Sequence, residues 1–144
     1  MTAQSPEMFI YRSRVYHSYD EPLRPFLEQR GVDRLDFGRW NLSSCSRGYQ
    51  GIWQITKSRL YLIALADPGD EEVDLSVVFP ECETRVFAHW FSGIIRLPYG
   101  AQLGGDVDVM FEPENFEFHH ELEFENGILI RAEDITNESV VEED

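Results

Sequence analysis

The sequence predicts a mainly β protein (α+β) in which one strongly curved antiparallel sheet, or a partly open barrel, is accompanied by one short helix. Three observations support this prediction. Apolar and polar residues alternate with a period of two over most of the chain, Gly, Pro and Asn residues separate the alternating runs, and a single segment has a helical pattern. A chain of 144 residues with 42% apolar residues can bury one core. We therefore expect one compact domain over residues 1–135 and an acidic, frayed tail over residues 136–144.

The N-terminal part of the chain is expected to contain a strand followed by the helix. Aromatic and β-branched residues alternate loosely from Phe9 to Tyr19, which favours a strand. Asp20 can cap the helix that follows, and Gly31 can end it. The buried stripe of this helix would consist of Leu23, Phe26 and Leu27.

A first hairpin is predicted for residues 52–65, around the loop Thr56-Lys57-Ser58-Arg59. Both faces of this hairpin are largely apolar, which indicates a pair of strands in the centre of the sheet. The expected cross-strand pairs are Ile55 with Leu60, Trp53 with Leu62 and Gly51 with Ala64.

A second hairpin, near the C-terminus, separates an apolar face from an acidic one. The apolar face carries Phe116, Phe118, Leu122 and Phe124, and the acidic face carries Glu117, His119, Glu121, Glu123 and Glu125. A two-residue loop at Asn126-Gly127 would mix the two faces. A three-residue loop that also includes Glu125 keeps them apart by pairing Phe124 with Ile128, and we prefer this register.

The charge of the chain is strongly asymmetric. Fourteen of its 27 acidic residues lie between Asp106 and Asp144, where Arg131 is the only basic residue, and the net charge is −15. Such a surface attracts basic partners and repels nucleic acid and anionic membranes. Eleven of the twelve basic residues are Arg, whose forked guanidinium suits fixed pairing with carboxylates, so we expect several of them to be structural partners of the acids.

The chain shows neither a membrane-spanning run of apolar residues nor a signal-peptide pattern at its start. We therefore expect a cytoplasmic protein that binds no membrane and no nucleic acid. The sequence leaves its oligomeric state open.

Two segments share the pattern aromatic-x-Gly-Ile-x-polar-aliphatic, at Tyr49–Ile55 and Phe91–Leu97. A strand glycine beside large aromatic residues is typical of a bulge or a bend, so we interpret Gly51 and Gly93 as structural. The alternative is a ligand slot between aromatic walls formed by Tyr49, Trp53, Trp90 and Phe91.

The middle of the chain resembles a group of small bacterial proteins of unassigned function. The resemblance covers residues 45–100 and also includes the later segment Phe124–Gly127. Its motifs are Arg47-Gly48-Tyr49-Gln50-Gly51-Ile52-Trp53, Leu60-Tyr61-Leu62, Val86-Phe87-Ala88-His89-Trp90-Phe91-Ser92-Gly93 and Arg96-Leu97-Pro98-Tyr99-Gly100. The resemblance implies a bacterial source and no particular activity.

Patterns that would indicate catalysis are weak. Cys45 could act as a nucleophile with Arg47 lowering the pKa of its thiol, but the sequence fixes no histidine partner. Glu117, His119 and Glu121 share a strand face and could hold a divalent cation, although acidic strand faces are usually only solvated. We predict no catalytic residues, no metal and no cofactor, and the sequence favours a protein without enzymatic activity.

Two hypotheses of function remain. In the first, the protein is an acidic protein-binding module, an immunity or inhibitor protein that neutralises a basic bacterial toxin. Its contact surface would be the acidic face of the second hairpin, formed by Glu117, His119, Glu121, Glu123 and Glu125. The alternative is a β domain, or an enzyme, that binds a small ligand in an aromatic pocket.

Overall fold

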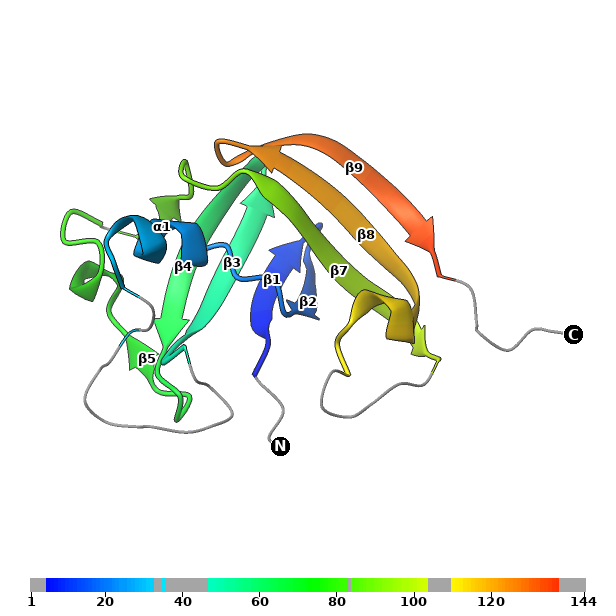
Figure 1. Ribbon diagram of the computed structural model, residues 1–144, viewed down its shortest axis with the longest axis horizontal. Coiled ribbons are helices and arrows are strands. Elements are labelled where there is room, and N and C mark those ends of the chain that lie inside the picture. Colours follow the sequence, from blue (N-terminus) through cyan, green and yellow to red (C-terminus); the bar gives the residue numbers. More distant parts are fainter. Residues whose placement is uncertain (1–4, 33–34, 36–46, 83, 104–109, 138–144) are drawn as a thin grey trace, which may run out of the picture.

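The computed structural model describes residues 5–32, 35, 47–82, 84–103 and 110–137 (Figure 1). These residues form one strongly curved sheet of nine strands and one short α-helix, and the sheet does not close into a barrel. This confirms the predicted fold class. The strands are β1 Glu7–Tyr11, β2 Arg14–Ser18, β3 Gln50–Thr56, β4 Arg59–Ala66, β5 Glu72–Val73, β6 Val86–Phe87, β7 Gly93–Gln102, β8 Phe116–Glu125 and β9 Ile128–Thr136. The helix is α1 Arg24–Gln29, and two 3₁₀ turns lie at η2 Leu75–Val77 and η4 Pro113–Asn115.

The strands follow the order β2-β1-β3-β4-β9-β8-β7, and the short strands β5 and β6 both pair with β4. The pair β1–β3 is parallel, so the expectation of an entirely antiparallel sheet is wrong at this point. Parallel neighbours need a crossover connection, and here β2 and α1 belong to the chain that makes it. The β3–β4 hairpin lies in the centre of the sheet, as its two apolar faces predict.

The β3–β4 hairpin has the predicted register near its turn. Ile55 lies opposite Leu60 and Trp53 opposite Leu62, around a turn whose two central residues have positive φ. Gly51 pairs with Leu65 rather than with Ala64, because the register shifts between Ile52 and Trp53. The expectation of a bulge near this glycine is therefore confirmed, and the single predicted pair beyond the bulge is wrong.

The β8–β9 hairpin differs from the preferred register. Its turn is the two-residue loop Asn126-Gly127, with Glu125 opposite Ile128. A register shift then places Glu123 opposite Arg131, so that Ile130 is the extra residue of a bulge. The bulge restores the separation of the apolar and acidic faces, which the predicted three-residue loop would also maintain.

The helix begins later than predicted. Leu23 occupies its N-cap position, and the carboxylate of Asp20 instead accepts hydrogen bonds from the Arg96 backbone N–H at 2.8 Å and from the Ser18 hydroxyl at 3.1 Å. The helix ends before Gly31, which has the expected positive φ. Its buried residue Phe26 packs against Trp90, whose indole N–H donates to the Pro22 carbonyl at 2.8 Å.

The core lies inside the curve of the sheet. The alternating pattern predicts eight mostly buried side chains, of which four are fully buried and four are partly buried. The fully buried ones are Trp53, Leu62, Leu122 and Phe124, and the partly buried ones are Val86, Trp90, Phe116 and Phe118. The two end strands, β2 and β7, lie against each other without pairing, and ring contacts such as that of Tyr16 with Tyr99 fill this seam.

Candidate functional site

The candidate site is the acidic face of the β8–β9 hairpin, which forms the long, sloping part of the sheet in Figure 1. Alternation along β8 brings Glu117, Glu121, Glu123 and Glu125 to one face, as predicted. Glu125 is exposed, and the other three are half-buried because each takes part in a contact within the chain. Three of the four carboxylates are therefore held in fixed positions.

Arg131 organises this face. Its guanidinium lies 3.0 Å from a carboxylate oxygen of Glu121 and 2.9 Å from one of Glu123, and it also pairs with Glu133. These carboxylates raise the pKa of Arg131 above its ordinary value. One cation faces three acids, so the cluster stays negative overall.

The remaining carboxylate of this row holds the neighbouring strand. Glu117 accepts a hydrogen bond from the backbone N–H of Ala101 at 2.9 Å, where the pairing of β7 with β8 is irregular. It therefore stabilises the end of β7 while staying part of the acidic face.

His119 does not belong to the exposed row. Its side chain is buried, next to Pro98 and Ile135 in the register of the neighbouring strands. Burial lowers the pKa of its imidazole, and its Nδ1 atom has no hydrogen-bond partner among the described residues. A neutral, enclosed imidazole contributes little to a charged docking surface.

Among the described residues, the four residues of the alternative aromatic slot line none of the three cavities that the structure shows. Tyr49 and Trp53 are fully buried, and Phe91 is 8% exposed and packs on Phe124. Trp90 is partly buried between Phe26 and Phe79. In this structure, all four pack within or against the core.

A buried ion pair explains the motif Arg-Gly-Tyr-x-Gly-x-Trp. The carboxylate of Glu7, on β1, accepts two hydrogen bonds from the Arg47 guanidinium, at 3.0 and 2.7 Å, one from the Gly51 N–H at 2.8 Å and one from the Trp53 indole N–H at 2.9 Å. Glu7 is 1% exposed and Arg47 is 4% exposed. This arrangement confirms the expectation that arginines act as structural partners of acids.

The structural role of Glu7 does not follow from the patterns in the sequence. One signal was present, because Glu7 is a lone acid at the start of the apolar run Met8-Phe9-Ile10. A buried acid needs a cationic or hydrogen-bonding partner, but the partner is about 40 residues away in the chain, which local patterns do not connect.

A second polar chain crosses the seam between the two halves of the sheet. The hydroxyl of Tyr16 lies 3.2 Å from Nε2 of His120, and Nδ1 of His120 lies 2.6 Å from a carboxylate oxygen of Asp134. In a catalytic site, a hydroxyl, an imidazole and a carboxylate in this order can act as nucleophile, base and orienting acid. Here the ring of Tyr99 stacks on His120 at 4.4 Å and that of Tyr11 packs on its edge, so the imidazole is enclosed. These three hydrogen-bonded side chains connect β2, β8 and β9, and none of them lines any of the three cavities.

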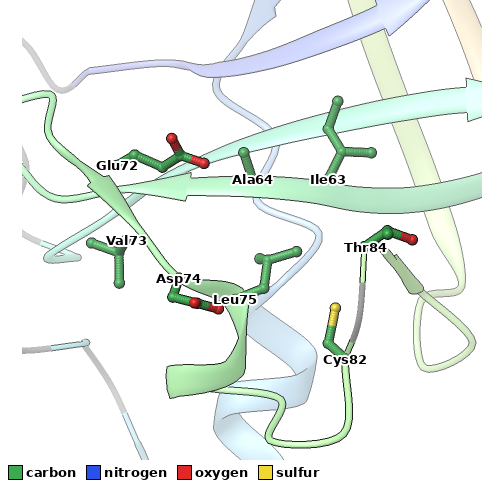
Figure 2. A pocket seen from close by; sticks show the side chains of 8 residues that line it. All are labelled: Ile63, Ala64, Glu72, Val73, Asp74, Leu75, Cys82 and Thr84. Carbon is green, nitrogen blue, oxygen red and sulfur yellow. The ribbon is translucent and has the colours of Figure 1, made fainter.

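The first of these cavities, of about 340 Å³, lies between β4 and the segment that follows η2 (Figure 2). Ile63 and Ala64 of β4 form one wall, and the thiol of Cys82 points toward them from the other side. Glu72 and Asp74 add carboxylates at the β5 end. Another hollow, of about 450 Å³, is lined by Pro6, Met8, His17, Gln50, Gly51, Ile52, Ala66, Asp70 and Phe111. The third hollow lies beside Arg30 and Arg85.

Two weak candidates from the sequence, the Cys45 nucleophile and the cation cluster, remain to be located. Cys45 lies outside the described residues. Within the described ranges, no three His, Cys, Asp or Glu side chains lie close enough together to hold a metal ion, and this includes Glu117, His119 and Glu121.

Comparison of the chain with protein-family models, with curated proteins and with solved structures finds no match. The resemblance to small bacterial proteins stays a prediction from the motifs. In the part of the chain that the structure describes, no helix is long and apolar enough to span a membrane.

Proposed function

We propose that the protein is an acidic, non-catalytic binding module whose β8–β9 hairpin docks on a basic protein, in the manner of an immunity protein that neutralises a cationic bacterial toxin. One observation carries the proposal. Residues 116–136 contain six carboxylates and a single arginine, and Arg131 holds three of the carboxylates in place. Side chains that are already ordered lose little conformational entropy when a partner binds.

Apolar contact area lies beside the carboxylates. Ile94, which is 44% exposed, faces Glu123 across the β7–β8 pair, and Ile130, at the bulge of β9, is 54% exposed. Protein interfaces combine apolar contacts with a polar rim, and electrostatic complementarity accelerates their association. The hairpin thus offers both parts of such an interface to a cationic partner.

The edge of the sheet adds accessible backbone. Over the described residues, β9 pairs with β4 only at Arg59 and Ile128, so most of its outer edge has no neighbouring strand. An exposed edge can pair with a strand of another protein. The acidic residues Glu133 and Asp134 on β9 would favour a basic strand there.

The test reverses charge on this surface. A double variant, Glu125→Lys with Glu133→Lys, changes two exposed residues and should leave the fold intact. The matched control, Glu28→Lys with Glu72→Lys, makes the same change in net charge at exposed positions elsewhere. The partner is captured from a lysate of the source organism or produced from the adjacent gene, and association rates are measured across salt concentration.

We expect the hairpin variant to associate at least about tenfold more slowly than the control at low salt, because steering by charge changes association rates by about 10- to 1,000-fold. The difference should shrink as salt screens the charges. Equal rates for the two variants would refute the hairpin as the docking surface.

A further inference from the structure

Two arginine-aromatic segments, residues 59–61 and 85–87, lie side by side where β4 pairs with β6. Arg59-Leu60-Tyr61 belongs to β4, and Arg85-Val86-Phe87 leads into and forms β6. Tyr61 and Phe87 face each other in the antiparallel register. Arg59 and Tyr61 are two apart in β4 and share a face, and Arg85, which precedes β6, lies on the same side because it packs over the Tyr61 ring.

Each arginine packs over the ring of the other segment. The guanidinium carbon of Arg85 lies 3.8 Å from the centre of the Tyr61 ring, and that of Arg59 lies 5.6 Å from the centre of the Phe87 ring. A third arginine, Arg30 at the end of α1, packs over Phe26 at 4.2 Å. Cation–π stacking of this kind holds a guanidinium by its flat face, so its N–H groups remain available in the plane.

A hollow of about 510 Å³ adjoins these arginines. Arg30 and Arg85 both line it. Its other lining residues are Val78, Phe79, Pro80, Glu81, Cys82, Val86, Phe87 and His89. Small-molecule sites have volumes of about 300–1,000 Å³ and combine apolar walls with a few polar groups. This hollow has the size and the lining of such a site.

In the part of the chain that the structure describes, the two arginines that line the hollow have no acidic partner, and neither has Arg59 beside them. Within the described part of the chain, Arg30, Arg59 and Arg85 form no ion pair, although the protein has 27 acidic residues and other arginines such as Arg47 and Arg131 are paired with them. Among the described residues that line the hollow, Glu81 is the one carboxylate, and it is exposed. Among the described residues, the hollow thus combines two guanidinium groups that form no ion pair with a single carboxylate.

We propose that this hollow binds a small organic anion that carries a carboxylate or phosphate on a flat apolar body. The anion is held by the N–H groups of Arg30 and Arg85, and the flat body lies against Phe79 and Phe87. Guanidinium groups bind both kinds of oxyanion through paired N–H donors, so the two head groups share one chemistry. A long polyanion such as nucleic acid is disfavoured, because the net charge of −15 repels it.

The experiment uses three naphthalene probes that differ only in their head group: 2-naphthoate, 2-naphthyl phosphate and the neutral 2-naphthamide. Binding to the full chain is measured by calorimetry and by the fluorescence of Trp90, which stacks on Phe79 at 5.5 Å. The variants are Arg30→Gln and Arg85→Gln. The control is Arg12→Gln, since Arg12 also packs over a ring, that of Tyr11 at 5.0 Å, but does not line the hollow.

We expect at least one anion to bind more tightly than the amide, and the tighter of the two anions then identifies the head group. Each hollow variant should weaken this binding by about tenfold or more, as loss of a hydrogen bond to a charged group does. The Arg12 variant should bind as the wild type does. Equal affinity for anion and amide, equal losses in the hollow and control variants, or no binding at millimolar probe would each overturn the proposal.

Discussion

At the scale of single residues, the most consequential contact is the buried pair of Glu7 and Arg47. Burial raises the pKa of the Glu7 carboxyl, whereas Arg47 and the N–H groups of Trp53 and Gly51 act in the opposite direction. Four N–H donors surround the two oxygen atoms. The pair links β1 to the segment that leads into β3. Both side chains are buried, so each one compensates the charge of the other in place of water.

We predict that Glu7→Gln and Arg47→Met each lower the free energy of unfolding by about 3–5 kcal/mol, because each leaves a buried partner without compensation. The double variant should cost clearly less than the sum of the two single variants. Chemical denaturation of all four proteins provides the measurement. Additive losses would show that the two side chains do not depend on each other.

At the scale of elements, the two glycine motifs play different parts. A Cβ atom at Gly51 would lie 2.3 Å from a carboxylate oxygen of Glu7 and 2.6 Å from the indole nitrogen of Trp53. At Gly93 the nearest atom would be a ring carbon of Phe91 at 3.3 Å. The first glycine makes room for the buried carboxylate, and the second lies against an adaptable ring.

We expect Gly51→Ala to destabilise the protein by more than about 2 kcal/mol, since it disturbs a buried polar network as well as packing. Gly93→Ala should cost distinctly less. Thermal denaturation of both variants distinguishes the two sites. A ranking in the reverse order would contradict the role given to Gly51.

The sequence predicted those elements whose cause is local. Alternation and turn residues located the β3–β4 and β8–β9 hairpins, the helix end and the acidic row. The alternation of apolar and acidic residues could not locate the bulge at Ile130. A bulge allows a two-residue turn to be combined with separated faces, so the alternation is compatible with either loop length. The parallel placement of β1 and the burial of His119 depend on neighbours that are distant in the chain. The two arginine-aromatic segments share the pattern Arg-x-aromatic, at Arg59-x-Tyr61 and Arg85-x-Phe87. The sequence does not predict that they lie together, because only the pairing of β4 with β6 brings them side by side.

At the scale of the whole molecule, the sheet has an open seam between β2 and β7. Asp20 lies at this seam, where its carboxylate accepts the N–H of Arg96 on the free edge of β7 and the hydroxyl of Ser18 at the end of β2. Burial raises the pKa of Asp20. One side chain thus replaces part of the strand pairing that would close a barrel.

We predict that Asp20→Ala increases the rate of hydrogen exchange at the Arg96 amide, because this N–H loses its acceptor. Asp20→Asn keeps an acceptor oxygen and should preserve most of the protection. Amide exchange followed by NMR gives both rates, and the amide of Leu122, in the core of β8, is an internal reference. Similar protection in the alanine variant and the wild type would mean that Asp20 does not close the seam.

The position of β1 has a consequence during synthesis on the ribosome. The β1–β2 hairpin is complete by Ser18, but β1 receives its second neighbour only when β3 emerges, roughly 40 residues and about 2–8 s later at ordinary rates of translation. During that interval, one edge of β1 has no partner strand. Glu7 stands on this strand as a charged residue without Arg47, and a charge on an unpaired edge discourages pairing with other nascent chains. The residue that anchors β1 in the finished sheet would therefore protect the same strand before the sheet exists.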